Sequence, residues 1–158
     1  MEVTTNMKLT EHFTLAELTA SHEAEKLGID NSAPPEIVPR LVLVAEMLER
    51  VRSALDAPIT VSSGYRCAAL NEAVGGAPGS DHPQGHAADI EAPAFGSATE
   101  VANALAPQIS VLGIGQIILE RLHSKQWVHL STHAPEKPIN RVITITDAGP
   151  VPGIIGLA

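Results

Sequence analysis

Several features that define large classes of proteins are scarce in this chain of 158 residues. A single cysteine, Cys67, excludes an internal disulfide framework and a cysteine-rich structural zinc site. Ten basic residues against eighteen acidic ones give a formal charge of -8, which argues against binding to nucleic acid phosphates. Because the sequence has no apolar run of membrane-spanning length and no basic-then-apolar opening, neither membrane insertion nor a secretory signal is predicted.

Aromatic residues are also rare, at 3% of a chain that is 44% hydrophobic. The core must therefore be built from Val, Ile, Leu and Ala, and a large side chain such as Trp127 stands out. The length fits one domain over 1–158, with tails at 1–8 and 147–158 that are expected to be loosely ordered.

The first part of the chain favours helices. Capping boxes begin at Thr14 and Ser97, each with a glutamate three residues later, and Gly28 is placed to end the first helix. Apolar residues recur every three or four positions over a long stretch that begins at Pro34. Helices are therefore predicted over about 15–27, 34–55, 67–74 and 98–106.

The later part favours strands. Short runs of alternating or continuous apolar residues predict strands at 58–62, 86–91, 116–120, 127–131 and 141–146. Residues 121–126 are predicted to form a hairpin loop, and the Gly- and Pro-containing tail from Asp147 shows no period. Helices followed by a mostly antiparallel set of strands indicate an α+β fold.

Ser80 to Asp89, followed later by Trp127-Val128-His129, is the most informative pattern. Because side chains alternate across a strand, Asp89 points away from the face that takes Ile90, and His129 shares a cleft-facing side with Trp127. His82 lies in a Gly- and Pro-rich loop that can fold back toward Asp89. These residues offer two imidazoles and a carboxylate with a fourth position free, the pattern of a catalytic zinc site.

Three other histidines compete for a metal. His86 has the wrong strand parity relative to Asp89, His123 falls in the predicted hairpin loop, and His133 lies past the strand end. They are therefore not predicted as ligands.

The whole pattern resembles the zinc D-alanyl-D-alanine carboxypeptidase family, which includes vancomycin-resistance dipeptidases and phage endolysins that cut peptidoglycan stem peptides. The resemblance rests on residues 61–66 (VSSGYR), 70–71, 75–76, 80–89 and 127–129. The opening, residues 9–18, is similar to the short phage and prophage branch. The resemblance implies the hedgehog/D-Ala-D-Ala peptidase-like fold, in which N-terminal helices pack on a small sheet that carries a zinc cleft.

The resemblance also implies one Zn²⁺ ion bound by His82, Asp89 and His129. Such an ion lowers the pKa of bound water toward about 7 and polarises the scissile carbonyl. Arg66 is implied to bind a substrate carboxylate, with Ser80 as a further hydrogen-bonding group. Trp127 is predicted as a further substrate-binding residue. On the residues alone, Arg66 could equally be an exposed turn residue and Ser80 a loop cap.

The general base departs from the family pattern. Several branches carry an acid three positions before the last histidine, where this chain has Gln126, which cannot accept a proton. Across the predicted hairpin, Glu120 lies opposite Trp127 and diagonal to His129, about 7 Å away. Glu120 is therefore predicted as the base, and the alternative is an ordinary exposed strand carboxylate.

The expected function is hydrolysis of a peptide bond in peptidoglycan stem peptides, with D-Ala-D-Ala carboxypeptidase and L-Ala-D-Glu endopeptidase action both open. Without a signal peptide, a phage or prophage lytic enzyme is expected to be made in the cytoplasm and to act on the cell wall after release. It could also act as part of a virion, with other virion proteins as partners. The alternative is a non-catalytic zinc-binding structural or cell-wall-binding virion module of the same fold.

Overall fold

In the computed structural model, which describes residues 7–133 and 137–155, short helices precede and interrupt a set of strands. The helices are α1 (Leu15–Thr19), α2 (His22–Leu27), α3 (Val38–Leu55), α4 (Ala68–Ala73) and α5 (Ala98–Leu105), followed by a 3-10 turn, η1 (Ala106–Gln108). The strands are β1 (Thr60–Ser63), β2 (Ala87–Glu91), β3 (Gln116–Leu122), β4 (Lys125–Ser131), β5 (Arg141–Thr146) and β6 (Gly149–Pro152). Residues 1–6 and 156–158 of the predicted tails lie outside the described residues.

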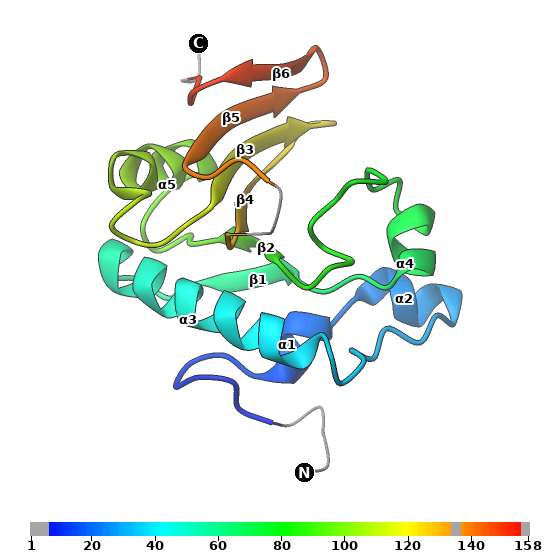
Figure 1. Cartoon of the computed structure of the whole chain (residues 1–158). Helices are drawn as coiled ribbons and strands as arrows, with labels where there is room; N and C mark the ends of the chain where they lie inside the picture. Colours follow the sequence, from blue (N-terminus) through cyan, green and yellow to red (C-terminus); the bar gives the residue numbers. More distant parts are fainter. Residues whose placement is uncertain (1–6, 134–136, 156–158) are drawn as a thin grey trace.

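The strands form one six-stranded sheet in the order β1-β2-β4-β3-β5-β6 (Figure 1). Neighbouring strands are antiparallel except for β3 and β5, which run parallel. The predicted α+β class with a mostly antiparallel sheet is therefore confirmed.

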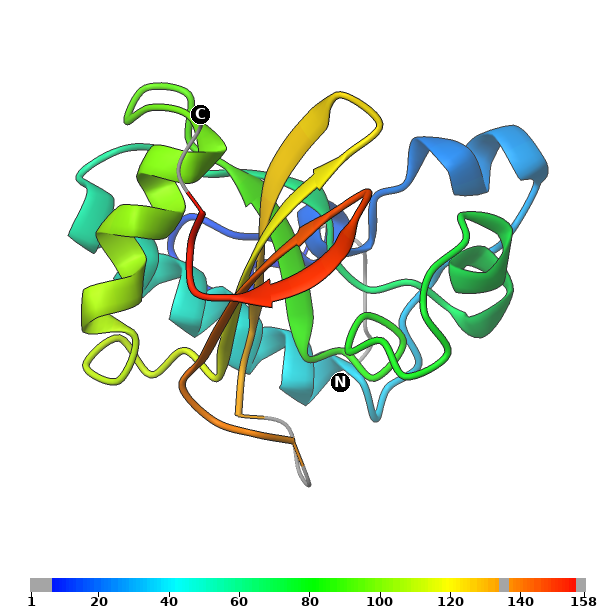
Figure 2. The same ribbon diagram turned by 90° about the horizontal axis from the view of Figure 1, so that it is seen from above.

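The core lies between the sheet and two helices. Figure 2 shows α3 and α5 on one side of the sheet and the α4 region on the other. Leu41 and Leu48 of α3 are fully buried in the same cluster as Ile90 and Leu130 of the sheet. Since this packing occupies one face of the sheet, the central strands turn their other face toward the loop that precedes β2.

The predicted first helix over 15–27 is in fact two helices. After Thr19 the backbone becomes extended, and the Ser21 side chain accepts a hydrogen bond from the backbone N–H three residues further on. A serine in this position begins a new helix, because its oxygen satisfies an otherwise unpaired N–H group. Gly28, with φ 69°, ends α2 as predicted.

The long helix also begins later than predicted. Residues 35–37 form a turn, and α3 starts at Val38 with Pro39 in its first turn. Proline is tolerated there because its missing N–H group would have no partner within the helix. The prolines at 34 and 35 thus precede the helix.

Two predictions for the strand region were wrong, one for the hairpin loop and one for the tail. The hairpin loop is only His123 and Ser124, both with positive φ, and the flanking pair Arg121 and Gln126 belongs to the strands. The tail from Asp147 contains β6, which was not predicted because its sequence, Gly-Pro-Val-Pro, is not typical of a strand. Proline cannot donate to a ladder and is confined to edge strands, which is the position β6 occupies.

Among residues 7–133 and 137–155, no helix is both long enough and apolar enough to span a membrane.

Candidate metal centre

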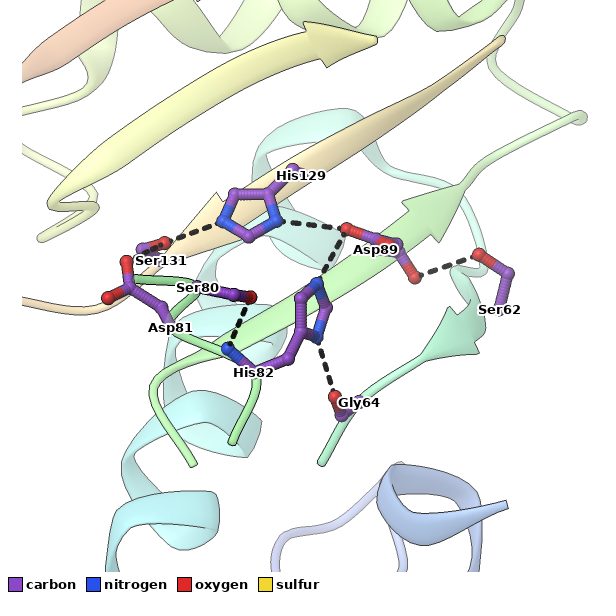
Figure 3. Close-up of polar contacts among 8 residues, drawn as sticks. All are labelled: Ser62, Gly64, Ser80, Asp81, His82, Asp89, His129 and Ser131. Carbon is purple, nitrogen blue, oxygen red and sulfur yellow. Dashed lines mark hydrogen bonds and ion pairs between the residues drawn. The ribbon is translucent and has the colours of Figure 1, made fainter. Parts of the chain in front are cut away.

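Three polar side chains from separate elements meet on the face of the sheet opposite α3 and α5. His82 comes from the loop before β2, Asp89 from β2 and His129 from β4, and all three point toward one another (Figure 3). His82 Nε2 lies 3.2 Å and His129 Nδ1 lies 3.0 Å from the same oxygen, Asp89 Oδ1. All three residues are buried.

The donor set fits a zinc ion. One ligand atom from each residue lies within 4.8 Å of the others. Tetrahedral ligands at about 2.0–2.1 Å from zinc are about 3.3 Å apart, close to the observed nitrogen–oxygen distances. In the part of the chain that the structure describes, this is the only group of His, Cys, Asp and Glu residues with such spacing.

A tight turn brings His82 to β2. Backbone hydrogen bonds run from Gly85 N to the carbonyl of His82 and from His86 N to the carbonyl of Asp81, at 3.2 and 3.1 Å. Gly85 has φ 74°, and a Cβ atom there would lie 2.8 Å from Ile37 Cγ2. Glycine is therefore required at position 85 by both backbone conformation and space.

The imidazole of His82 is oriented by a backbone carbonyl. Its Nδ1 lies 2.6 Å from Gly64 O, which assigns the N–H to Nδ1 and leaves the Nε2 lone pair facing Asp89. Gly64 follows an irregularity in the pairing of β1 with β2, and a Cβ atom on it would lie 2.3 Å from Leu18 O. The glycine thus lets α1 approach the strand closely enough to place this carbonyl.

The imidazole of His129 is oriented by a chain of two side chains. His129 Nε2 lies 2.8 Å from Ser131 Oγ, and the Ser131 hydroxyl donates to Asp81 Oδ2 at 2.8 Å. Lys137 Nζ lies 3.6 Å from Asp81 Oδ1. Because a carboxylate only accepts, the Ser131 hydroxyl donates its hydrogen to Asp81. A lone pair of the same hydroxyl oxygen therefore accepts from an N–H group at His129 Nε2. The Nδ1 lone pair then faces Asp89.

Charges in the cluster reinforce each other. When both histidines are protonated toward Asp89, with no metal between them, burial still acts to raise the pKa of Asp89, but the His82 charge and the hydrogen bonds from both histidines hold it well below its usual range. Burial acts to lower the pKa of His129, yet the hydrogen bond and charge of Asp89 raise it overall. Asp89 is therefore held as a carboxylate, the form that binds metals.

The cluster opens into a cleft of about 700 Å³. Arg66, Glu120 and Trp127 line this cleft together with the three cluster residues. Arg66 is half-buried, and its Nε has no hydrogen-bond partner among the described residues. Burial lowers the pKa of Arg66, opposed by the charges of Asp89 and Glu120. All three residues line the same cleft. Another hollow, of about 520 Å³ over α3, is shallow, and neither His82 nor His129 lines it.

Glu120 occupies the position predicted from hairpin pairing. It pairs with Trp127, and its neighbour Ile118 pairs with His129, so Glu120 is diagonal to His129 on the same face. Burial raises the pKa of Glu120 and the charge of Asp89 raises it further, against opposing effects of His129, Arg66 and Trp127. Gln126, in contrast, is exposed and is not among the cleft residues.

The remaining predicted residues have mixed outcomes. Ser80 lines the cleft, but its Oγ accepts a hydrogen bond from His82 N at 3.2 Å, which is the loop-cap alternative. His86 and His133 lie outside the metal-binding group. His123 lies on the cleft rim, and its exposed ring is 3.8 Å from Asp147.

Several residues that support the site were not predicted from the sequence. Asn31 is buried, and its amide donates to the carbonyl of Tyr65 while its oxygen accepts from Cys67 N, which fixes the segment carrying Arg66. Asp81 and Ser131 were not predicted as partners, because they are 50 residues apart. The parity of Ser131 with His129 was the one available signal.

Comparison with known proteins agrees with the geometry. No curated protein matches the chain. A family model described as Peptidase M15 matches residues 11–131, which include every residue of the candidate metal centre and Arg66 and Glu120. The predicted resemblance is confirmed at the level of the family, and the chain belongs to the Peptidase M15 family of zinc-dependent metallopeptidases that act on peptidoglycan peptides.

Proposed function

We propose that the protein hydrolyses a peptide bond in peptidoglycan stem peptides, with one Zn²⁺ ion held by His82, Asp89 and His129. The observation that carries this proposal is the convergence of the buried cluster with Glu120 and Arg66 in one cleft. Peptide hydrolysis by a metal-activated water needs a base, a group that binds the substrate carboxylate, and a Lewis acid. Glu120, Arg66 and the metal-binding cluster offer these three groups in one cleft.

Each residue has a distinct role in this proposal. Zinc bound to the cluster supplies Lewis acidity, which activates water and polarises a carbonyl. Glu120 accepts the proton of the attacking water and delivers it to the leaving amine, and its raised pKa suits that exchange. Arg66 binds a substrate carboxylate with two parallel N–H donors, and Trp127 packs against the substrate beside it. Ser80 stabilises the loop and offers its hydroxyl at the cleft wall.

Arg66 and the opening residues 9–18 carry the proposals for the bond that is cut and for the biological setting. Both D-Ala-D-Ala and L-Ala-D-Glu bonds lie near a free carboxylate, so Arg66 fits carboxypeptidase and endopeptidase action alike. The opening residues 9–18 support a phage or prophage lytic enzyme. Such an enzyme acts on the cell wall after release or as part of a virion.

Digestion of purified peptidoglycan tests the activity and identifies the bond. The zinc-loaded protein should release fragments whose masses and new termini identify the bond that was cut. Glu120→Gln should lose at least about a hundredfold in turnover, as expected for a proton-transfer group, while retaining zinc. Glu91→Gln, an exposed strand glutamate on β2, is the matched control and should remain active. Full activity of the Glu120→Gln protein would exclude Glu120 as the base.

A non-catalytic module of the same fold is the second candidate. Gln126 favours it, because that position carries an acid in several branches of the family. Zinc binding without any fragment release by the native protein would support this candidate and refute the enzyme proposal.

A further inference from the structure

The cleft continues beyond the part of the chain that matches the family. The family match ends at residue 131, and β5 and β6 follow it. Arg141, Ile143 and Ile145 occupy alternate positions on β5 and all line the cleft. The intervening Val142 packs against the core cluster, and Thr144 is fully buried. β5 thus adds a new row of side chains to the face that carries the metal-binding cluster.

The strand register places these residues relative to the cluster. His129 pairs with Ile118 and Ile118 with Ile143, which gives one row across three strands. A second row runs through Trp127, Glu120, Ile145 and Pro150. Neighbouring strands are about 4.8 Å apart, so β5 lies about 10 Å from β4, the length of about three residues of extended peptide.

We call the four aliphatic residues of these rows the apolar floor. Its members, Ile118, Ile143, Ile145 and Pro150, all line the cleft. An apolar surface beside a polar reaction centre suits the aliphatic part of a substrate.

The back of the hairpin is anchored. Thr144 Oγ1 donates to Gly153 O at 2.7 Å and accepts from Ile155 N at 3.0 Å. The Arg121 guanidinium donates to Ile155 O and, at 2.9 Å, to Thr99 Oγ1 near the start of α5. These bonds hold β5 and β6 in place, so the apolar floor is a preformed surface.

The cleft carries more basic than acidic side chains. Four of the ten lysines and arginines line the cleft, together with three acidic side chains, in a chain of net charge -8. Arg141 stands at the start of β5 next to Ile143 on the same face, while Lys125 stands at the hairpin end of β4. Both are exposed and free to meet a ligand. This distribution favours an anionic ligand over a neutral one.

We propose that the apolar floor and Arg141 form a substrate subsite for an extended acidic peptide segment about three residues from the scissile bond. An aliphatic side chain of the segment lies on the apolar floor, and a carboxylate inside the peptide pairs with Arg141. The proposal rests on the proposed function, since the segment belongs to the same stem peptide that reaches the metal centre. Arg141 acts in binding and is distinct from Arg66, which serves the carboxylate near the scissile bond.

Calorimetric titration tests the subsite independently of turnover. Two stem peptides are used, one with free internal carboxylates and one with these carboxylates amidated, and both keep the C-terminal carboxylate. They are titrated into the zinc-loaded Glu120→Gln protein, alone or with a second substitution. Arg141→Gln should raise the Kd of the free peptide about fivefold and leave that of the amidated peptide within about twofold. Ile145→Thr keeps a β-branched side chain and should raise the Kd of both peptides about threefold.

Two further substitutions serve as matched controls. Lys26→Gln removes an exposed cation on α2, and Val111→Thr alters a side chain that is 86% exposed outside the cleft. Both should leave each Kd unchanged. Thermal unfolding of every variant shows whether the fold is retained.

The outcomes separate the subsite from the proposed function. An equal effect of Arg141→Gln on both peptides, no effect on either, or no binding of the free peptide would overturn the subsite. A normal Kd after Ile145→Thr would overturn the apolar floor as a contact. Absence of peptidoglycan cleavage by the native protein refutes the proposed function alone, because the Kd pattern still decides the subsite.

Discussion

Removal of the Ser131 hydroxyl should weaken zinc binding without touching a proposed ligand. Ser131 is 1% exposed, accepts from His129 Nε2 and donates to Asp81. Alanine is smaller than serine and fits in the same space. The substitution Ser131→Ala removes the hydroxyl that is the partner of both His129 Nε2 and Asp81. The His129 ring is then free to adopt the other tautomer, in which Nδ1 carries the proton and cannot bind a metal.

The expected magnitude follows from the buried hydrogen bonds. An N–H group left unpaired in the interior costs about 1–3 kcal/mol, and the buried Asp81 carboxylate loses one donor as well. Loss of such a partner of a metal-binding histidine typically lowers metal affinity about tenfold to a hundredfold. The zinc Kd of Ser131→Ala should therefore rise by about that factor.

Competition with a chromophoric chelator measures the zinc Kd directly. Ser62→Ala is the matched control, because the exposed Ser62 hydroxyl donates to the backbone carbonyl of Asp89 at 3.3 Å and not to a ligand side chain. Its zinc Kd should stay within about twofold of the native value. Equal zinc affinity of the native and Ser131→Ala proteins would refute the orienting role of Ser131.

Two other predictions concern stability. Gly85→Ala should lower the free energy of unfolding by more than Gly75→Ala in urea titrations. Both glycines have φ 74°, which costs another residue about 1–2 kcal/mol, but only at Gly85 would the Cβ atom meet Ile37 Cγ2, at 2.8 Å. Equal losses would contradict the clash. For Glu49, burial acts to raise the pKa, but hydrogen bonds from His12 lower it overall. Glu49→Gln should therefore reduce stability at pH 7, and the deficit should vanish as the pH falls through about 4.3 and below. A deficit that stays constant between pH 7 and pH 3 would contradict this linkage.

Local sequence periods determined much of the candidate site. The alternation of side chains in β2, β3 and β4 places Asp89, His129 and Glu120 on the cleft face, as predicted. The hairpin register survives the error in loop length, because a two-residue turn and the predicted six-residue loop both pair Glu120 with Trp127. The capping box at Thr14 also appears as predicted, since it depends on a contact three residues apart.

Only the tertiary structure decided how the side chains of the cluster are oriented and how far the cleft extends. Asp81 and Ser131 are 50 residues apart, and the contact of Gly64 with α1 joins elements that no local period relates. β5 was predicted as a strand, but its parallel place beside β3 follows from long-range pairing. The physical reason is the range of the interactions: alternation and capping act within a few residues, whereas proton placement and strand order depend on groups that only folding brings together.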